Sequence, residues 1–211
     1  WRIRGPAAGT PCAARRCRMP TVPRVPPFDR LATYDDLVKL PDNLVAEIAD
    51  GELHASPRPA FPHAGAGAAI GGFLMPAFDW GRGGPGGWLI FYEPELHLGA
   101  DVLVPDWAGW RRTRMPHRPD TPYATLAPDW LCEILSPSTS SFDRKTKLAI
   151  YAREGVPWAW LIDPLARTLE VLKLENGRWT ILATHVGSEV VRADPFEAIE
   201  VGLAALWGET S

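Results

Sequence analysis

The residues of this 211-residue sequence that could do chemistry are acids and one lysine. Glu133 sits inside the apolar run Trp130–Leu135, a pattern typical of a buried strand. A carboxylate in a buried strand costs free energy unless a cation or a metal ion accompanies it. Asp106 follows another strand-like run, and Lys147 lies 14 residues after Glu133 on the next expected helix.

These residue types together are the parts of a metal-dependent phosphodiesterase. Carboxylates hold one or two Mg²⁺ (or Mn²⁺) ions, which polarise a phosphate and lower the pKa of an attacking water. A lysine then orients that water or stabilises the developing negative charge. We choose Asp106 over Asp129 as the partner of Glu133, because Asp129 and Glu133 would stand roughly 13 Å apart along one strand. That separation is too large for one Mg²⁺ ion, whose ligands lie at about 2.1 Å.

Other site motifs are absent or weak. The sequence contains no HExxH, GxSxG, GxxxxGK[ST] or CxxC pattern, and its five histidines have no ligand spacing. The segment Gly65–Gly71 has its third glycine one place late for a dinucleotide loop, and prolines precede it where a strand is required. The acids and Lys147 therefore stay as the candidates for catalysis.

The elements that must position these residues mix strands and helices. Asp50-Gly51 and Asn176-Gly177 indicate two hairpins. We expect an Ala/Gly-rich helix from about 63 to 79 and a second helix over 142–154, which is entered through serines. The other expected elements are a short helix capped by Thr33 and strands at 88–92, 95–98, 102–104, 130–135, 158–162, 169–174 and 179–185. This order predicts a mixed α/β or α+β domain around a central sheet.

The expected helix over 142–154 has a polar and an apolar side. The polar stripe consists of Arg144, Lys147, Tyr151 and Glu154. The apolar side consists of Leu148, Ala149 and Ala152.

Charge divides the chain into two parts. The whole sequence has a net charge of −3, 46% hydrophobic residues and no run of apolar residues long enough to cross a membrane. Residues 1–27 hold six arginines and no acid, so residues 28–211 keep 16 basic against 25 acidic residues, a net charge of −9. We interpret residues 1–27 as a disordered Arg/Pro-rich tail or a spurious extension, with a nucleic-acid-binding arm as the alternative. The acidity of the remainder argues against tight, nonspecific DNA binding.

Several segments together carry a family resemblance. In chain order they are Glu47 before Asp50-Gly51-Glu-Leu, Ser56-Pro57, His63, Pro105-Asp106, Glu133-Ile-Leu-Ser-Pro-Ser-Thr139, Asp143-x-x-x-Lys147-x-x-x-Tyr151-x-x-x-Gly155-Val and Trp160-Leu-Ile-Asp163-Pro. In order and spacing, the chain resembles the Uma-two family of restriction endonucleases over about residues 28–207. That family belongs to the PD-(D/E)XK nuclease superfamily.

The resemblance implies a restriction-endonuclease-like core, with a central mixed β-sheet flanked by helices. It implies that Asp106 and Glu133 are metal ligands, helped by the backbone carbonyl of Leu135. It also implies that Lys147 is the catalytic cation, and that Glu47 is an additional acid that holds metal or orients water. The superfamily pattern would place a lysine at position 135, so in this chain the lysine has moved to the next helix.

Structural roles stay open for the same residues. The alternative for Glu133 is a buried acid neutralised structurally by Lys147 or Arg144. Glu47 can be a solvated acid near a turn, and Asp143 a residue that stabilises the first helical turn. The remaining residues with two interpretations are Tyr151 (packed or catalytic), His63 (phosphate contact or helix start), and Ser136, Ser138 and Thr139 (helix caps in preference to nucleophiles).

Our first hypothesis is a Mg²⁺-dependent endonuclease that hydrolyses DNA phosphodiester bonds. The alternatives are a catalytically inactive nuclease-fold module that binds DNA or a protein partner, and a metal-dependent hydrolase of another phosphate ester. DNA is the expected substrate, and a homodimer is expected by analogy with the superfamily. The missing export signal and the three cysteines indicate a cytoplasmic protein with no membrane contact.

Overall fold

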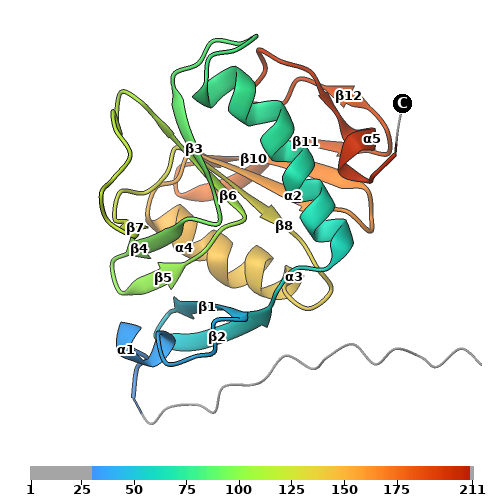
Figure 1. Cartoon of the computed structure of the whole chain (residues 1–211). Helices are drawn as coiled ribbons and strands as arrows, with labels where there is room; N and C mark the ends of the chain where they lie inside the picture. The colour runs from blue at the N-terminus through green and yellow to red at the C-terminus, as the bar shows by residue number, and fades with distance from the viewer. Residues whose placement is uncertain (1–29, 210–211) are drawn as a thin grey trace, which may run out of the picture.

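A six-stranded mixed sheet forms the centre of the protein in a computed structural model, which describes residues 30–209 (Figure 1). Across the sheet the strands are β11 (Arg178–Val186), β10 (Thr168–Glu175), β9 (Trp158–Asp163), β8 (Trp130–Ile134), β6 (Trp107–Arg111) and β3 (Trp88–Tyr92). β8 and β9 run parallel, and every other neighbouring pair is antiparallel. The predicted mixed fold class is therefore confirmed, whereas the predicted tail at 1–27 lies outside the described residues.

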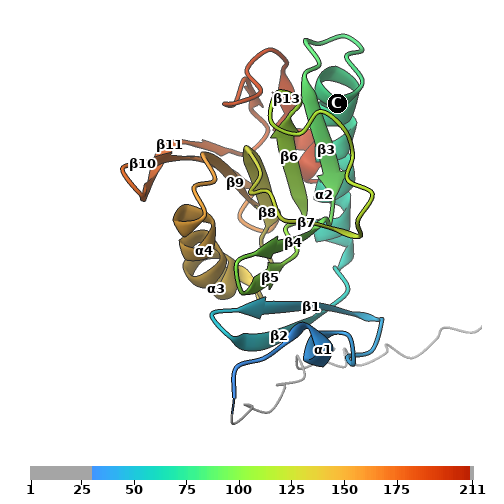
Figure 2. The ribbon, with the colours of Figure 1, turned by 90° about the vertical axis from the view of Figure 1, so that its left-hand side faces the viewer.

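Helices cover both faces of this sheet, as Figure 2 shows. On one face lie α2 (Phe61–Leu74) and the π-helical turn η1 (Met75–Asp79). On the other face the chain coils continuously through α3 (Ser140–Phe142), the π-helical turn η2 (Asp143–Lys147) and α4 (Leu148–Arg153). Successive side chains of a strand point to opposite faces of the sheet, so the same strands contribute to the hydrophobic core on each face. Trp88 and Ile90 pack toward α2, while Leu89 packs toward α4.

A smaller five-stranded sheet lies against one end of the large one. In order its strands are β2 (Glu52–Pro57), β1 (Leu44–Ala49), β5 (Asp101–Leu103), β4 (Glu95–Leu98) and β7 (Tyr123–Ala124). The β1–β2 hairpin turns through Asp50 and Gly51, which both adopt positive φ, as the predicted turn requires. The short helix α1 (Tyr34–Leu37) precedes the hairpin and begins after Thr33, as predicted.

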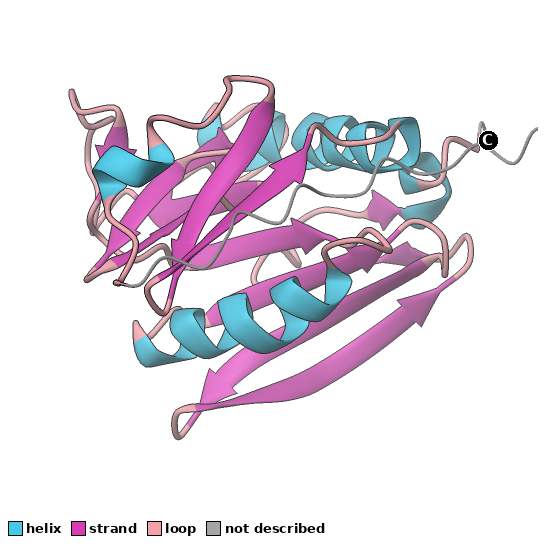
Figure 3. Ribbon diagram, turned by 90° about the horizontal axis from the view of Figure 1, so that it is seen from below, coloured by secondary structure: helices cyan, strands magenta, loops and turns pink. Residues whose placement is uncertain are grey.

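The C-terminal segment closes the core on the α2 side. It comprises β12 (Val190–Val191), β13 (Val201–Gly202) and α5 (Leu203–Leu206). Phe196 inserts among three buried tryptophans, with its ring centroid 4.9 Å from those of Trp88 and Trp130 and 5.6 Å from that of Trp160. Strands make up most of the regular structure (Figure 3). Within residues 30–209, no helix is both long and apolar enough to cross a membrane.

Strand β6 is the main element that the sequence prediction missed. Its residues Trp107, Ala108, Gly109 and Trp110 are all buried, so the strand shows no alternation of polar and apolar side chains. The prediction also missed three two-residue strands (β7, β12 and β13) and the four-residue helix α5. Elements this short carry no periodic signal. The predicted helices and all seven predicted strands are confirmed, with ends shifted by at most three residues.

Helix α2 can approach β6 closely only because Gly71 lacks a side chain. A Cβ atom at Gly71 would lie 2.6 Å from the Trp107 ring, whereas a Cβ atom at the exposed Gly72 would meet nothing within 4 Å. Trp107 also donates a hydrogen bond from Nε1 to the Gly67 carbonyl at 3.1 Å. This contact sets the depth at which α2 sits on the sheet.

The two neighbouring glycines therefore predict opposite effects of one substitution. Gly71→Ala should lower the free energy of unfolding by about 1–3 kcal/mol, because it forces the Trp107 ring away. Gly72→Ala should raise it by about 0.5–1 kcal/mol through the helix propensity of alanine. Urea unfolding of both variants, followed by circular dichroism, measures the difference. Equal effects at the two positions would contradict the close approach.

Candidate active site

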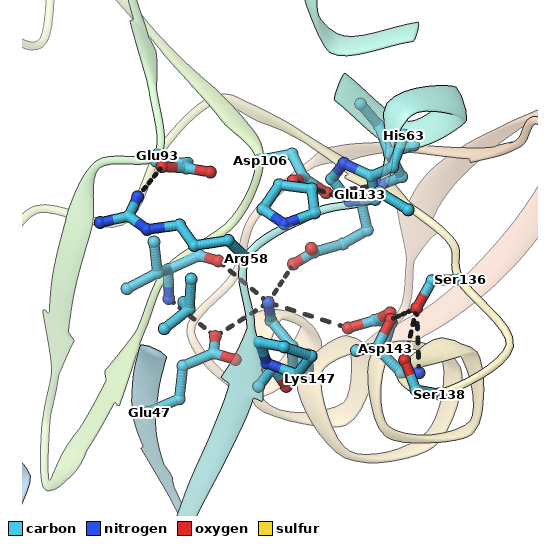
Figure 4. Close-up of a pocket in the computed structure, with 18 of the residues that line it drawn as sticks. Glu47, Arg58, His63, Glu93, Asp106, Glu133, Ser136, Ser138, Asp143 and Lys147 are labelled. Carbon is cyan, nitrogen blue, oxygen red and sulfur yellow. Dashed lines mark hydrogen bonds and ion pairs between the residues drawn. The ribbon is translucent and has the colours of Figure 1, made fainter. Parts of the chain in front are cut away.

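A pocket of about 280 Å³ lies between the β1–β2 hairpin and the carboxyl end of β8 (Figure 4). Its ionisable lining residues come from segments far apart in the sequence. They are Glu47 on β1, Arg58 before α2, His63 on α2, Glu93 before β4, Asp106 before β6, Glu133 on β8, and Asp143 and Lys147 on η2. The large sheet, both helical layers and the hairpin therefore each contribute to one site.

The ammonium group of Lys147 is the centre of this cluster. Its Nζ lies 2.9 Å from Glu47 Oε1, 2.9 Å from Glu133 Oε1 and 3.9 Å from Asp143 Oδ1. It also donates a hydrogen bond to the Val104 carbonyl at 3.1 Å. Lys147 is only 2% exposed, so these contacts replace nearly all of its hydration.

Strand alternation and helix geometry bring Glu133 to Lys147. Leu131, Glu133 and Leu135 point to the same face of β8, and the two leucines pack in the core beneath α4. Lys147 and Tyr151 are four residues apart and so lie on one side of the helix. Tyr151 donates a hydrogen bond from its hydroxyl to Glu133 Oε1 at 2.8 Å. The Glu133 carboxylate is therefore held by two side chains of the same helical segment.

Glu47 and Asp106 are each held by a backbone amide as well as by a side chain. Glu47 Oε1 accepts a hydrogen bond from the Val104 N–H at 2.8 Å, beside its ion pair with Lys147. Asp106 Oδ2 accepts one from the Ile134 N–H at 2.6 Å, and its Oδ1 lies 3.2 Å from His63 Nε2. The Ile134 amide follows Glu133 directly, so this bond ties Asp106 beside the Glu133 position.

Burial and an excess of acids shift the pKa values in this pocket. Burial raises the pKa of Glu133 well above its usual range, and it raises the pKa of Asp143 to about 6. Burial lowers the pKa of Lys147, but the charges of Glu133 and Glu47 outweigh that effect and raise it, so the amine is protonated. For His63, burial also lowers the pKa, and the hydrogen bond and charge of Asp106 reverse this into a net rise.

The structure brings four of the five predicted site residues together. Glu47, Asp106, Glu133 and Lys147 all line the pocket. The fifth, Leu135, is not among the lining residues, and its side chain packs in the core beneath α4, whereas its neighbour Ile134 does line the pocket. The role of the Leu135 backbone carbonyl as a metal ligand stays a prediction.

The structure also tests the alternative structural roles that the sequence left open for residues in and near the site. Asp129 lies outside the pocket, where its carboxylate accepts a hydrogen bond from the Arg111 N–H and pairs with Arg114. Arg144 pairs with Glu170 at 2.6 Å, so Lys147 is the cation that neutralises Glu133. The serine and threonine hydroxyls at 136, 138 and 139 hydrogen-bond to one another just before α3. The N-cap residue of α3, Thr139, makes no side-chain capping hydrogen bond, so the predicted capping role was wrong for this helix.

Burial does not follow the two predicted sides of the helix over 142–154. Lys147 and Tyr151 of the polar stripe are fully buried, whereas Ala149 of the apolar side is exposed. Lys147 can be buried because the acids of the pocket compensate its charge, whereas Arg144 of the same stripe is exposed and pairs with Glu170. Asp143, interpreted as a first-turn residue, points into the pocket as well, and its i, i+4 spacing from Lys147 was the signal for this.

Comparison with known proteins agrees with this fold. Residues 31–205 match the model of the Uma2 family, which is described as "Putative restriction endonuclease". A crystal structure of a nuclease of the DUF820 group from Anabaena variabilis, itself described as putative, superposes with a TM-score of 0.62 at 23% identity. The superposition covers 84% of this chain and 98% of that one, and shows that the two share a fold. No curated protein matches the sequence.

The family match and the shared fold together confirm the restriction-endonuclease-like core that the sequence predicted. The match spans the hairpin, both helical layers and every ionisable residue of the pocket. The chain belongs to the Uma2 family.

Proposed function

We propose that the protein is a metal-dependent endonuclease that hydrolyses DNA phosphodiester bonds, acting in the cytoplasm. The observation that carries the proposal is the convergence of Glu47, Asp106, Glu133 and Lys147 on one pocket. The DUF820 structure is described as a "putative nuclease" and the family as "Putative restriction endonuclease", which supports the reaction type. A homodimer, as expected from the superfamily, is part of the same proposal.

The donor set of the pocket fits Mg²⁺ or Mn²⁺. Across residues 30–209, no group of three or more His, Cys, Asp or Glu side chains forms a ready-made metal cage. Mg²⁺ needs no such cage, since it is usually bound through one or two carboxylates and completes its shell with water and phosphate. Asp106 and Glu133 would hold the ion, with Glu47 as the further acid. A bound ion would polarise the phosphate and lower the pKa of a coordinated water.

The protein's own residues supply orientation and charge. Tyr151 and Lys147 fix one Glu133 oxygen, and the Ile134 amide and His63 fix Asp106, so both acids are oriented before substrate arrives. The protonated Lys147 amine offers the positive charge that stabilises a phosphate whose negative charge increases during hydrolysis. Arg58 lies at the pocket and is 63% exposed, where it can contact the incoming phosphate.

A second candidate is a nuclease-fold module that binds DNA or a protein partner without catalysis. One observation favours it: Lys147 is already saturated by Glu47, Glu133 and the Val104 carbonyl in a closed ion cluster. Such a cluster can serve structure alone. An activity measurement separates the two candidates.

Cleavage of plasmid DNA should require both central residues of the cluster. Glu133→Gln and Lys147→Met should each lower the cleavage rate in Mg²⁺ or Mn²⁺ by at least about 100-fold, because each removes a charge acting at the phosphate. Conversion of supercoiled to nicked and linear plasmid gives the rate, and EDTA should abolish cleavage by the wild type.

Two exposed positions provide matched controls. Lys145→Met lies on the same helical segment and Glu175→Gln lies at the end of β10, and both should cleave like the wild type. Thermal melting of every variant checks that it is folded. If the wild type binds DNA but cleaves no better than the variants, the second candidate is correct.

The balance of charge in the pocket predicts a cost in stability. Three lining carboxylates, those of Glu47, Glu133 and Asp143, contact the single buried amine of Lys147, and Asp143 has the longest contact to it, 3.9 Å. The pKa of Asp143 rises from its ordinary 3.8 to about 6. Between those values the unfolded chain releases a proton that the folded protein keeps, so stability falls as the pH rises, and the whole penalty is present above pH 6.

Asp143→Asn should remove this penalty. The variant and the wild type should be about equally stable near pH 4, and the variant should gain up to about 3 kcal/mol over the wild type at pH 8. Urea unfolding at pH 4, 6 and 8 in the presence of EDTA measures the difference. A variant that is no more stable than the wild type at pH 8 would show that the charge of Asp143 is well accommodated by Lys147.

A further inference from the structure

A cluster of arginines lies at the end of β6 opposite the pocket. It consists of Arg111, Arg112, Arg114 and Arg118, which we call the arginine cluster, and all four side chains are exposed. Residues 107–119 contain no acid, although residues 28–211, which we call the body, have a net charge of −9. A quarter of the 16 basic residues of that body are therefore gathered in eight positions.

Two buried acids anchor the cluster from below. Asp79, whose side chain is 1% exposed, binds Arg112 Nη2 at 2.8 Å and Arg118 Nη2 at 3.5 Å. Asp129 binds Arg114 Nη1 at 2.9 Å and accepts the Arg111 N–H at 2.8 Å. Three guanidinium groups pair with these two carboxylates, and the guanidinium of Arg111 pairs with neither, so the anchored cluster keeps a surplus of positive charge.

Aromatic rings hold two of the guanidinium groups in place. The Arg111 guanidinium lies 4.5 Å from the centroid of the Trp88 ring, and that of Arg118 lies 5.5 Å from the Phe91 ring. A guanidinium stacked on a ring still directs its N–H groups outward in the plane. Preorganised exposed guanidinium groups of this kind match the oxygens of phosphate groups.

We propose that the arginine cluster binds the phosphate backbone of duplex DNA several base pairs from the bond that enters the pocket. This inference rests on the proposed function. Asp106 precedes β6 and Arg111 ends it, so the cluster stands about 17 Å along the strand from the pocket. Duplex DNA rises about 3.4 Å per base pair, which makes this distance roughly five base pairs.

The arginine cluster also explains how a chain that is acidic over residues 28–211 could bind DNA. Carboxylates gathered in and around the pocket repel DNA at short range only, because salt screens exposed charges beyond about 8–10 Å. A separate positive surface can therefore attract the backbone on its own. Acidic polypeptides are a less suitable ligand, because guanidinium groups held at fixed positions favour the regular phosphate spacing of a duplex.

The test is DNA binding by the full chain in EDTA, where no cleavage occurs. Arg111→Gln/Arg118→Gln is the informative variant, since Arg112 and Arg114 still pair with Asp79 and Asp129. Lys39→Gln/Arg178→Gln, at exposed positions outside the cluster, makes the same change in net charge. Fluorescence anisotropy with a labelled 25-base-pair duplex at several salt concentrations gives the affinity and its salt dependence.

We expect the cluster variant to bind about tenfold more weakly at 0.1 M salt and its log–log salt slope to fall by about 1–2. The control variant should behave like the wild type. Equal loss in both variants, or no binding by the wild type, would overturn the inference. So would displacement of the DNA by polyglutamate at equal charge, which would assign the cluster to an acidic polypeptide.

The outcome is separate from that of the cleavage experiment. If Glu133→Gln abolishes cleavage and the cluster variant binds normally, the proposed function holds and this inference fails. If the wild type never cleaves DNA but binds it through the cluster, the proposed catalysis fails and this inference stands.

Discussion

One buried ammonium group shared between carboxylates is the interaction on which the site depends. Lys147 can stay charged at 2% exposure only because Glu47 and Glu133 lie 2.9 Å from it. Those acids in turn can stay in an apolar interior only because Lys147 and backbone amides compensate them. The hairpin, the central strand β8 and the helical segment are therefore held to one another by charge as well as by apolar packing.

This constraint explains why two different sheets meet at the pocket. Glu47 belongs to the hairpin of the small sheet, whereas Glu133 belongs to the centre of the large sheet. Close packing of α2 over Gly71 and of α4 over the leucines of β8 fixes the distances between these layers. A site assembled in this way is oriented before any ligand arrives, at the cost of an acid, Asp143, that the interior disfavours.

The distribution of charge matters more than the net charge of −3. Acids are concentrated in the pocket, where a cation would offset them, and arginines are concentrated at the far end of β6. Since salt limits the reach of each group to about 8–10 Å, the two surfaces act independently. An acidic chain can therefore carry a surface suited to a polyanion.

The sequence by itself determined the fold class, the hairpin at Asp50-Gly51 and the identity of the acids and the lysine of the pocket. Turn residues and an acid in an apolar strand are local signals. Only the tertiary structure decided which face of the helix over 142–154 points inward. Periodicity identified a polar stripe but not its direction, and Lys147 lies inside because acids from two other elements compensate it. It also decided between Ile134 and Leu135 as pocket residues, and it added β6 and Asp143. Pairing across sheets depends on residues distant in the chain, and no local pattern contains that information.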